Sequence, residues 1–419
     1  MNNCLEKECS NFEELLGFYS SRLISYPLIP PEHVYFALTN RCSLKCLMCD
    51  IPKTPSGIED ELSTSKIKEI ILQIKDLGVK HLVFSGGEPL LREDLLDILE
   101  FSVSNDIKNV ALITNGVLLD DCIVQKLIKI QLCHITISLD GLKKTNDEIR
   151  GKGVFEKTVA NIDKLNFYKE KFNAAFPTVG INFTIMNRNI DDILDIIELA
   201  KNKRYNAIVF QPILFSNISM YEKKTNILWP SKEDVLKLRK VMHKVINLKN
   251  KLNGLGIYTE DAVLKTIPDY FTGKRLGSDF KCFEAIKRIV ITYDGKVWSC
   301  MGSYGNLKED NLKNIWFSKD AMAIRDKIKN CNAHCLQDCV YFPSNILDKT
   351  KELLKKIKGA KAKKKEIKSR LLAKLRYYTN ILSEENKDVP SPFGCNDSSL
   401  FRKEIDTLCS IKKELMKIS

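Results

Sequence analysis

Long apolar runs and a secretory start are both missing from this sequence of 419 residues. No uninterrupted apolar run approaches the roughly 18 residues that suggest a transmembrane helix, so the chain is not expected to span a membrane. The first ten residues, MNNCLEKECS, include acidic side chains and lack the apolar segment of a signal peptide. We therefore expect a cytoplasmic protein, in a reducing environment that disfavours disulfides.

Cysteine, in contrast, is abundant. The chain contains 14 cysteines, and several of them are separated by only two to four residues. In a reducing compartment, cysteines at such short spacings are more often ligands of a metal or cluster than members of disulfides. The spacing therefore predicts metal or cluster sites.

The net charge of +13 is concentrated in one segment, because residues 349–374 carry +10 of it. The main part of the chain is nearly neutral, so the total charge is no argument for nucleic-acid binding along the whole chain. The basic segment predicts a solvated helix that packs through one apolar stripe, formed by Leu353, Leu354, Ile357, Ile367, Leu371 and Leu372. The alternative is docking on an anionic surface of lipid, acidic protein or nucleic acid.

Apolar runs typical of strands alternate with amphipathic segments between residue 33 and about residue 215. The alternation predicts an α/β fold with a parallel sheet and right-handed crossovers, either a partial barrel or a doubly wound sheet. In both architectures, functional side chains lie at the carboxyl ends of the strands. The six predicted strands cover residues 33–38, 81–85, 109–114, 133–139, 179–186 and 207–214.

The remaining segments suggest further parts. A helix is predicted over residues 233–251, and Asp294 with Gly295 predicts a hairpin turn before Cys300. We divide the chain into a leader (1–32), a core barrel (33–235), a linker helix with a cysteine-rich domain (236–345) and a basic helical tail (346–419).

The first cysteine motif directly follows the first predicted strand. The segment NRCSLKCLMCD places Cys42, Cys46 and Cys49 in the pattern CxxxCxxC. Three thiolates on a four-iron cluster leave one iron free to bind another ligand, which indicates reactivity rather than structural use. A zinc site is the alternative, although structural zinc usually takes four protein ligands.

A glycine-rich motif follows the second predicted strand. In FSGGEPLLRED, Gly86 and Gly87 allow a backbone to approach a ligand closely, and Glu88 with Pro89 fixes the turn. One βα unit separates this motif from the cysteine loop, so the two motifs are expected at neighbouring strand ends.

Together these motifs resemble the radical S-adenosylmethionine (SAM) superfamily over residues 33 to about 215. The resemblance implies a partial (β/α)6 barrel of the TIM type and a [4Fe-4S] cluster on Cys42, Cys46 and Cys49, whose open iron binds SAM. It also implies that one electron cleaves SAM to methionine and a 5'-deoxyadenosyl radical, which removes a hydrogen atom from the substrate. The cofactor then supplies the difficult chemistry, and the barrel positions it.

The resemblance also implies SAM contacts. Met48 matches the position beside the adenine, and Gly86, Gly87 and Glu88 match the strand end that binds the methionine amino group. Asn115 and Ser138 match strand ends near the ribose. Arg150 matches an arginine that pairs with the SAM carboxylate, a task suited to a guanidinium, although Asn146 stands where relatives often have a histidine.

A second set of cysteines lies between residues 282 and 339. This set resembles the SPASM or twitch extension of radical SAM enzymes, which holds auxiliary [4Fe-4S] clusters. The full SPASM pattern has about seven cysteines in this region and this chain has five, so we expect one auxiliary cluster; a zinc knuckle with His334 is the alternative. The predicted ligands are Cys282 and Cys300 with two of Cys331, Cys335 and Cys339.

The leading hypothesis is an enzyme that oxidises, epimerises or cross-links its substrate. Small carbohydrate-like metabolites are placed slightly ahead of peptides, and a flavodoxin- or ferredoxin-like protein is the expected electron donor. An RNA-modifying radical SAM enzyme is a second hypothesis, motivated by the basic tail. A non-catalytic iron-sulfur electron carrier is a third, and it predicts no affinity for SAM.

Overall fold

The fold was analysed in a computed structural model of the chain. The structure describes residues 2–51, 57–214, 227–273, 280–331, 335–336, 341–343, 350–353, 355–356, 364–383, 410–413 and 416. None of the described helices combines the length and the apolar character that are required to cross a membrane.

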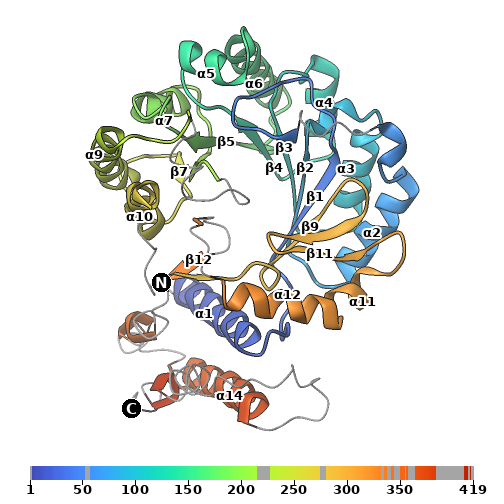
Figure 1. Ribbon diagram of the computed structural model, residues 1–419, viewed down its shortest axis with the longest axis vertical. Coiled ribbons are helices and arrows are strands. Elements are labelled where there is room, and N and C mark those ends of the chain that lie inside the picture. Colours follow the sequence, from blue (N-terminus) through green and yellow to red (C-terminus); the bar gives the residue numbers. More distant parts are fainter. Residues whose placement is uncertain are drawn as a thin grey trace.

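A single large sheet organises most of the described chain (Figure 1). Its strand order is β11-β10-β9-β1-β2-β3-β4-β5-β6-β7, and neighbouring strands from β9 and β1 through β7 are parallel. All six predicted barrel strands are confirmed within one or two residues at each end. They are β1 (His33–Thr39), β2 (His81–Gly86), β3 (Asn109–Thr114), β4 (His134–Ser138), β5 (Thr178–Ile185) and β6 (Ala207–Pro212), and β7 (Gly256–Ile257) adds a short edge.

Helices cover the outside of the curved sheet, so the strands form the inner layer of a partial barrel (Figure 1). In α2 (Thr64–Asp76), Ile67, Ile70, Ile71 and Ile74 are fully buried, because their spacing places them on one face of the helix. The other helices and turns of this layer are η2 (Ile58–Asp60), η3 (Pro89–Leu91), α3 (Leu95–Ser104), α4 (Asp121–Lys129), α5 (Lys143–Arg150), α6 (Val154–Lys171), α7 (Asp192–Asn202), α9 (Lys232–Lys249) and α10 (Asp261–Thr272).

The cysteine-rich region extends the barrel sheet. Strand β9 pairs in parallel with β1, and β10 returns antiparallel to β9 through the predicted hairpin, where Gly295 has a φ of 92°. The region consists of β8 (Phe280–Cys282), β9 (Arg288–Ile291), β10 (Lys296–Ser299), β11 (Gly302–Asn306), α11 (Leu312–Trp316), α12 (Lys319–Lys329) and β12 (Tyr341–Pro343). The cysteine-rich region is therefore joined to the barrel sheet beside β1, the strand that precedes the first cysteine motif.

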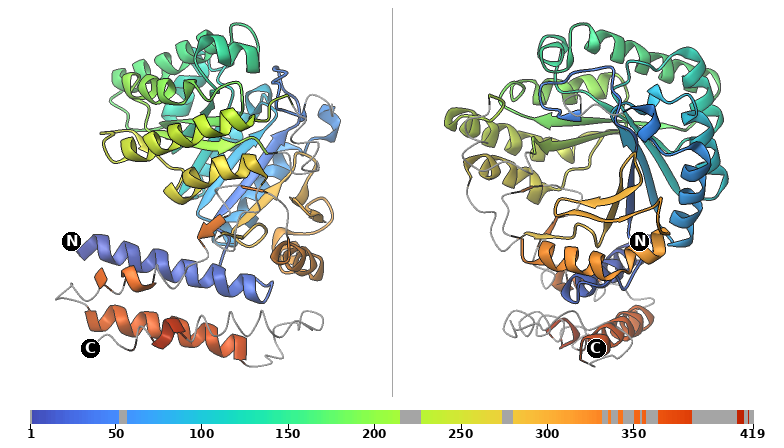
Figure 2. Two further views of the ribbon diagram at one scale, coloured as in Figure 1. Left: turned by 60° about the vertical axis from the view of Figure 1, so that its left-hand side comes forward. Right: turned by 45° about the vertical axis from the view of Figure 1, so that its right-hand side comes forward.

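The predicted leader contains a helix of 22 residues, α1 (Asn2–Leu23), and it packs along α14 (Lys364–Ser383) (Figure 2). Their contact forms a second hydrophobic core, in which Phe12 and Leu16 of α1 share a cluster with Ile367 and Leu371 of α14. The predicted stripe of the basic segment is thus buried at Leu353, Ile367 and Leu371 and half-buried at Leu372, whereas Leu354 and Ile357 lie outside the described residues.

Candidate functional site

The first three cysteines gather on the loop that leaves β1. Cys42, Cys46 and Cys49 are all partly buried, and the backbone N–H of Cys49 donates to the carbonyl of Cys46 at 3.1 Å. Burial raises the pKa of the Cys42 and Cys46 thiols, and each of these thiols lies close enough to Cys49 to be affected by its charge. The structure therefore brings the three predicted ligands together at the carboxyl end of β1.

The donor set of this loop fits an iron-sulfur cluster, since thiolates are the usual ligands of such clusters. The backbone N–H of Leu44 lies 3.5 Å from the Cys42 sulfur, an interaction of the kind that stabilises a thiolate. Within the described residues, no three histidine, cysteine, aspartate or glutamate side chains are arranged to hold a single metal ion. The assignment of the cluster ligands remains a prediction that rests on the gathering of the thiols.

The two glycines of the second motif are needed because the cysteine loop packs directly on them. A Cβ on Gly86 would lie 2.3 Å from the carbonyl oxygen of Thr39, and a Cβ on Gly87 would lie 2.2 Å from that of Arg41. The N–H of Gly87 donates to Thr39 at 2.7 Å, and the N–H of Glu88 donates to Arg41 at 2.8 Å. The backbone that approaches these glycines in the structure is therefore that of the loop that carries the cysteines.

The Glu88 carboxylate joins the end of β2 to the end of β3. It is fully buried and accepts hydrogen bonds from the Thr114 hydroxyl at 2.6 Å, the Asn115 N–H at 2.8 Å and the Leu90 N–H at 3.1 Å. Burial raises the pKa of Glu88, while these hydrogen bonds and the charge of Arg150 act in the opposite direction. The carboxylate fixes the shape of this strand end, and its contact with the SAM amino group remains a prediction.

Arg150, the last residue of α5, points at the cysteine loop. Its Nη2 lies 2.6 Å from the carboxylate of Asp140, and its Nη1 lies 3.9 Å from the Cys46 sulfur. Asp140 is itself fully buried, and its other oxygen accepts from the Thr184 N–H at 2.7 Å. The Nε atom of Arg150 is buried and has no hydrogen-bond partner among the described residues. The guanidinium is thus held in place with one donor still available.

Polar atoms without partners line the neighbouring strand ends. Asn115 Nδ2 and Asn182 Oδ1 are buried and make no hydrogen bond within the described chain. Ser138 lies opposite Asn182 in the register of β4 and β5, and Met48 packs on the main core from the cysteine loop. Buried polar groups normally have partners, so these free atoms fit a site that receives a polar ligand such as SAM.

Sequence reasoning missed a buried network that supports the cysteine loop. The Glu61 carboxylate accepts hydrogen bonds from Arg41 Nε at 2.8 Å and from Arg92 Nη1 at 3.1 Å. Arg92 also donates to the carbonyl of Leu38 at 3.1 Å and forms an ion pair with Asp94. Arg92 belongs to the motif FSGGEPLLRED. Its place shortly after Glu88 in the sequence was the one available sign that it takes part in the site.

Four cysteines of the second set lie within the described residues, with Cys282 at the end of β8 and Cys300 directly after β10. Burial raises the pKa of the Cys282 thiol, and Cys300 and Cys335 lie close enough to raise it further. Burial also raises the pKa of Cys300 to about 11, with contributions from the charges of Glu284, Cys335 and Cys331. Cys282, Cys300 and Cys335 thus lie within electrostatic range of one another and Cys331 within range of Cys300, whereas Cys339 and His334 lie outside the described residues.

Helix α1 is hydrogen-bonded directly to the second cysteine set. Arg22 donates through Nε to the carbonyl of Cys282 and through Nη2 to the carbonyl of Lys329, both at 2.9 Å. In return, Lys329 Nζ donates to the carbonyl of Leu23 at 3.2 Å. The first helix of the chain therefore helps to position a predicted cluster ligand 260 residues away in the sequence.

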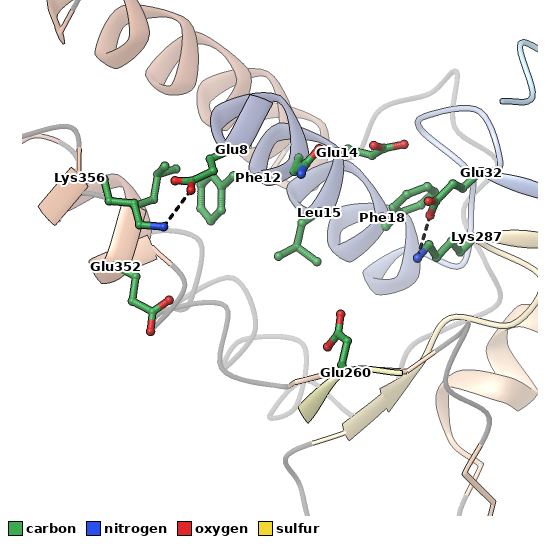
Figure 3. Close-up of a pocket in the computed structure, with 12 residues that line it drawn as sticks. Glu8, Phe12, Glu14, Leu15, Phe18, Glu32, Glu260, Lys287, Glu352 and Lys356 are labelled. Atoms are coloured by element: carbon green, nitrogen blue, oxygen red, sulfur yellow. Dashed lines mark hydrogen bonds and ion pairs between the residues drawn. The ribbon is translucent and has the colours of Figure 1, made fainter. Parts of the chain in front are cut away.

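A cavity of about 440 Å³ lies between α1 and the edges of the barrel (Figure 3). Phe12, Leu15 and Phe18 of α1 line it together with polar residues of the same helix, and mostly charged residues of other segments complete the lining, including an ion pair between Glu32 and Lys287 at 2.7 Å. None of the predicted site residues lines this cavity. It is therefore separate from both cysteine sites.

Two known families match the chain, one over the barrel and one over the cysteine-rich region. Residues 36–200 match the radical SAM superfamily, and residues 282–340 match an iron-sulfur cluster-binding domain, SPASM. The fold and site thus define a radical SAM domain followed by a SPASM domain. The chain therefore contains a radical SAM domain and a SPASM domain, and the cofactors of these domains are SAM and [4Fe-4S] clusters.

Known relatives include enzymes with different substrates. The chain is 26% identical to Fe-coproporphyrin III synthase of Methanosarcina barkeri, over 71% of this chain and 76% of that protein. It is 28% identical to PqqA peptide cyclase of Rhizobium meliloti, over 70% of this chain and 76% of that protein.

Solved structures share the fold. Streptococcus suis SuiB bound to S-adenosylmethionine has a TM-score of 0.58 at 18% identity, over 75% of this chain and 77% of that chain. SuiB bound to its precursor peptide SuiA has a TM-score of 0.55, over 75% of each chain. The partial barrel with a following SPASM domain is therefore confirmed.

Proposed function

We propose that this chain is a radical SAM enzyme with one catalytic and one auxiliary cluster. Cys42, Cys46 and Cys49 would hold the SAM-binding cluster. Cys282, Cys300 and two of Cys331, Cys335 and Cys339 would hold the auxiliary one. The observation that carries the proposal is the gathering of three thiols beside Arg150. Their loop is held by hydrogen bonds from the backbone N–H groups of Gly87 and Glu88.

When bound, the cluster and SAM would supply radical chemistry that can remove a hydrogen atom from the substrate. The residues of the chain hold the reactants in place for this step, which is the main contribution of a protein to cofactor chemistry. The hydrogen bond from the Gly87 N–H to the Thr39 carbonyl fixes the start of the cysteine loop. Arg150 offers a positive charge for the carboxylate of SAM. Asn115 Nδ2 offers a buried donor for the ribose.

We further propose a peptide as the substrate, in place of the small carbohydrate-like metabolite favoured on sequence grounds. The similarity to PqqA peptide cyclase and to SuiB, whose structure was solved with its precursor peptide SuiA, supports a peptide. A tetrapyrrole, as in the name of Fe-coproporphyrin III synthase, is the competing outcome. The location in the cytoplasm and a flavodoxin- or ferredoxin-like electron donor stay predictions.

The substrate class can be tested with an extract of the native host cell. Extract that contains the substrate is expected to accelerate formation of 5'-deoxyadenosine by the reconstituted enzyme. For a peptide substrate, treating the extract with a protease, followed by a protease inhibitor, should abolish the acceleration. Acceleration that survives the protease and passes a membrane of about 1 kDa cut-off would instead identify a small molecule.

Replacing Arg150 by lysine is expected to weaken SAM binding by about 10- to 100-fold, because a lysine cannot keep both the Asp140 and Cys46 contacts and still donate to a carboxylate. Calorimetry under anaerobic conditions on the reconstituted protein measures the affinity. Iron content should stay unchanged, since Arg150 is not a proposed ligand. An affinity equal to that of the wild type would remove Arg150 from the SAM site.

A further inference from the structure

Three phenylalanines on one side of the barrel are exposed to solvent. Phe167, Phe172 and Phe176 are 58%, 46% and 43% exposed, and they lie at the end of α6 and in the loop before β5. The ring of Tyr168 connects two of them, at 5.2 Å from the Phe167 ring and 5.8 Å from the Phe172 ring. These four residues form an aromatic patch. Soluble proteins rarely expose large apolar side chains side by side, so the patch indicates a binding surface.

A hollow of about 610 Å³ lies next to the aromatic patch. Phe172 and Phe176 form part of its wall, and Ile128 and Lys129, at the end of α4, form another part. Helices α4 and α6 lie side by side in the outer layer (Figure 1). None of the described residues that line the hollow is acidic, and Lys129 is the only charged residue among them. The patch and the hollow therefore form one apolar surface that carries positive charge.

The charges beside this surface are positive because the acidic residues of α6 are already neutralised. All three of them form ion pairs with cations of other segments, whereas Lys129 and Lys171 form no ion pair within the described residues. The ion pairs are Glu156–Lys143, Asp163–Lys203 and Glu170–Arg204. Lys171 lies instead over the rings of Tyr168 and Phe172, at 5.8 and 6.0 Å from their centroids. Unpaired lysines beside exposed aromatic rings are complementary to an anionic partner.

We propose that the aromatic patch, together with Lys129 and Lys171, docks the protein on an anionic lipid bilayer. The phenylalanines enter the boundary between headgroups and acyl chains, and the lysines contact the lipid phosphates. A lipid surface fits these residues better than an acidic protein does, because protein–protein interfaces are depleted in lysine. The contact is peripheral and does not depend on the proposed function.

The aromatic patch lies at the end of the barrel opposite to the cysteine loop. Phe176 precedes β5 at the amino ends of the parallel strands, whereas the cysteine loop follows β1 at their carboxyl ends. Docking therefore leaves the predicted SAM site accessible. Helix α14, which carries part of the basic segment, lies at the other end of the molecule from α6 (Figures 1 and 2). One flat bilayer does not contact both, so an experiment can separate them.

The test is flotation of the reconstituted full-length protein with vesicles of phosphatidylcholine, alone or mixed in equal parts with phosphatidylglycerol. The wild type should bind the mixed vesicles and bind the neutral ones much more weakly. The double variant Phe172→Ser, Phe176→Ser should weaken binding at least about tenfold, because two apolar side chains no longer enter the bilayer. The matched control is Leu236→Ser on α9, where the leucine is 63% exposed, and it should change nothing.

The lysines are tested with the same vesicles. Lys129→Gln with Lys171→Gln should weaken binding about 30-fold, since each lysine near an anionic surface contributes about fivefold. Lys355→Gln with Lys374→Gln removes two charges from exposed positions of the basic segment and should leave binding close to that of the wild type. In Phe172→Trp, the fluorescence that the new tryptophan adds should be quenched by brominated lipid.

Weaker binding in both patch variants, unchanged binding in both controls and quenching by brominated lipid support the inference. A wild type that does not bind overturns it. Binding that survives the phenylalanine variant and falls when Lys355 and Lys374 are replaced assigns the contact to the basic segment and also overturns it. A dimer in sedimentation velocity that the phenylalanine variant dissociates would show that a second copy covers the patch, with the same consequence. Thermal unfolding verifies that each variant is folded, and none of these outcomes bears on the proposed function.

Discussion

The triple variant Cys42→Ala, Cys46→Ala, Cys49→Ala is expected to reduce the iron content from about eight to about four atoms per chain. The three thiols are proposed as the ligands of one cluster, so their removal should eliminate that cluster and leave the auxiliary one in place. SAM binding should be lost together with the first cluster. Iron and acid-labile sulfide after anaerobic reconstitution provide the measurement.

Two other cysteines provide the control for this experiment. Cys122 is exposed and Cys133 is partly buried, and neither belongs to the two cysteine sites. Replacing either by alanine should leave the iron content unchanged. An iron content of about four that falls to none in the triple variant would contradict the auxiliary cluster. An unchanged content of about eight would contradict the assignment of the first three ligands.

Replacing Gly87 by alanine should have the second large effect. The new Cβ would lie 2.2 Å from the backbone oxygen of Arg41, so the cysteine loop has to move and the hydrogen bonds from Gly87 to Thr39 and from Glu88 to Arg41 are strained or lost. Overpacking of this kind costs typically about 1–3 kcal/mol. We expect SAM affinity to fall at least about tenfold, since 1.4 kcal/mol corresponds to a factor of ten.

A matched control for Gly87 is Gly254, where an added Cβ meets no atom within 4 Å. Its φ of +80° is unfavourable for alanine, so Gly254→Ala should lower stability by a similar amount without affecting SAM. Calorimetric titration with SAM and thermal unfolding compare the two variants. Equal SAM affinity in Gly87→Ala and Gly254→Ala would show that the packing of the cysteine loop on Gly87 does not support the SAM site.

Much of the barrel could be predicted because its strands are local features of the sequence. Each strand is an apolar run with turn residues at its ends, and each helix between them has its own apolar stripe. Helix α1 was missed although its signal was present. Its buried face consists of Cys9, Phe12, Leu16, Tyr19 and Leu23, at spacings of three and four residues. Part of this face packs against α14, which lies more than 340 residues further along the chain.

The candidate site was predicted from motifs, and the contacts that support it were not. Cys46 and Gly87 could be recognised because their neighbours in the sequence form known patterns. The bonds from Arg92 to Glu61 and from Arg22 to Cys282 join segments 31 and 260 residues apart. No local period or motif encodes such contacts, since they depend on how the folded elements meet. Likewise, only the structure shows why positions 86 and 87 require glycine, because the cysteine loop packs directly on Gly86 and Gly87.

The proposed radical SAM chemistry depends on the cluster at Cys42, Cys46 and Cys49. The most direct test is to incubate the reconstituted enzyme with SAM and dithionite under strict anaerobiosis and to quantify 5'-deoxyadenosine and methionine by chromatography. The wild type should form both products, and the triple cysteine variant should form neither. If the wild type carries its iron and sulfide and leaves SAM intact, the chain does not perform radical SAM chemistry.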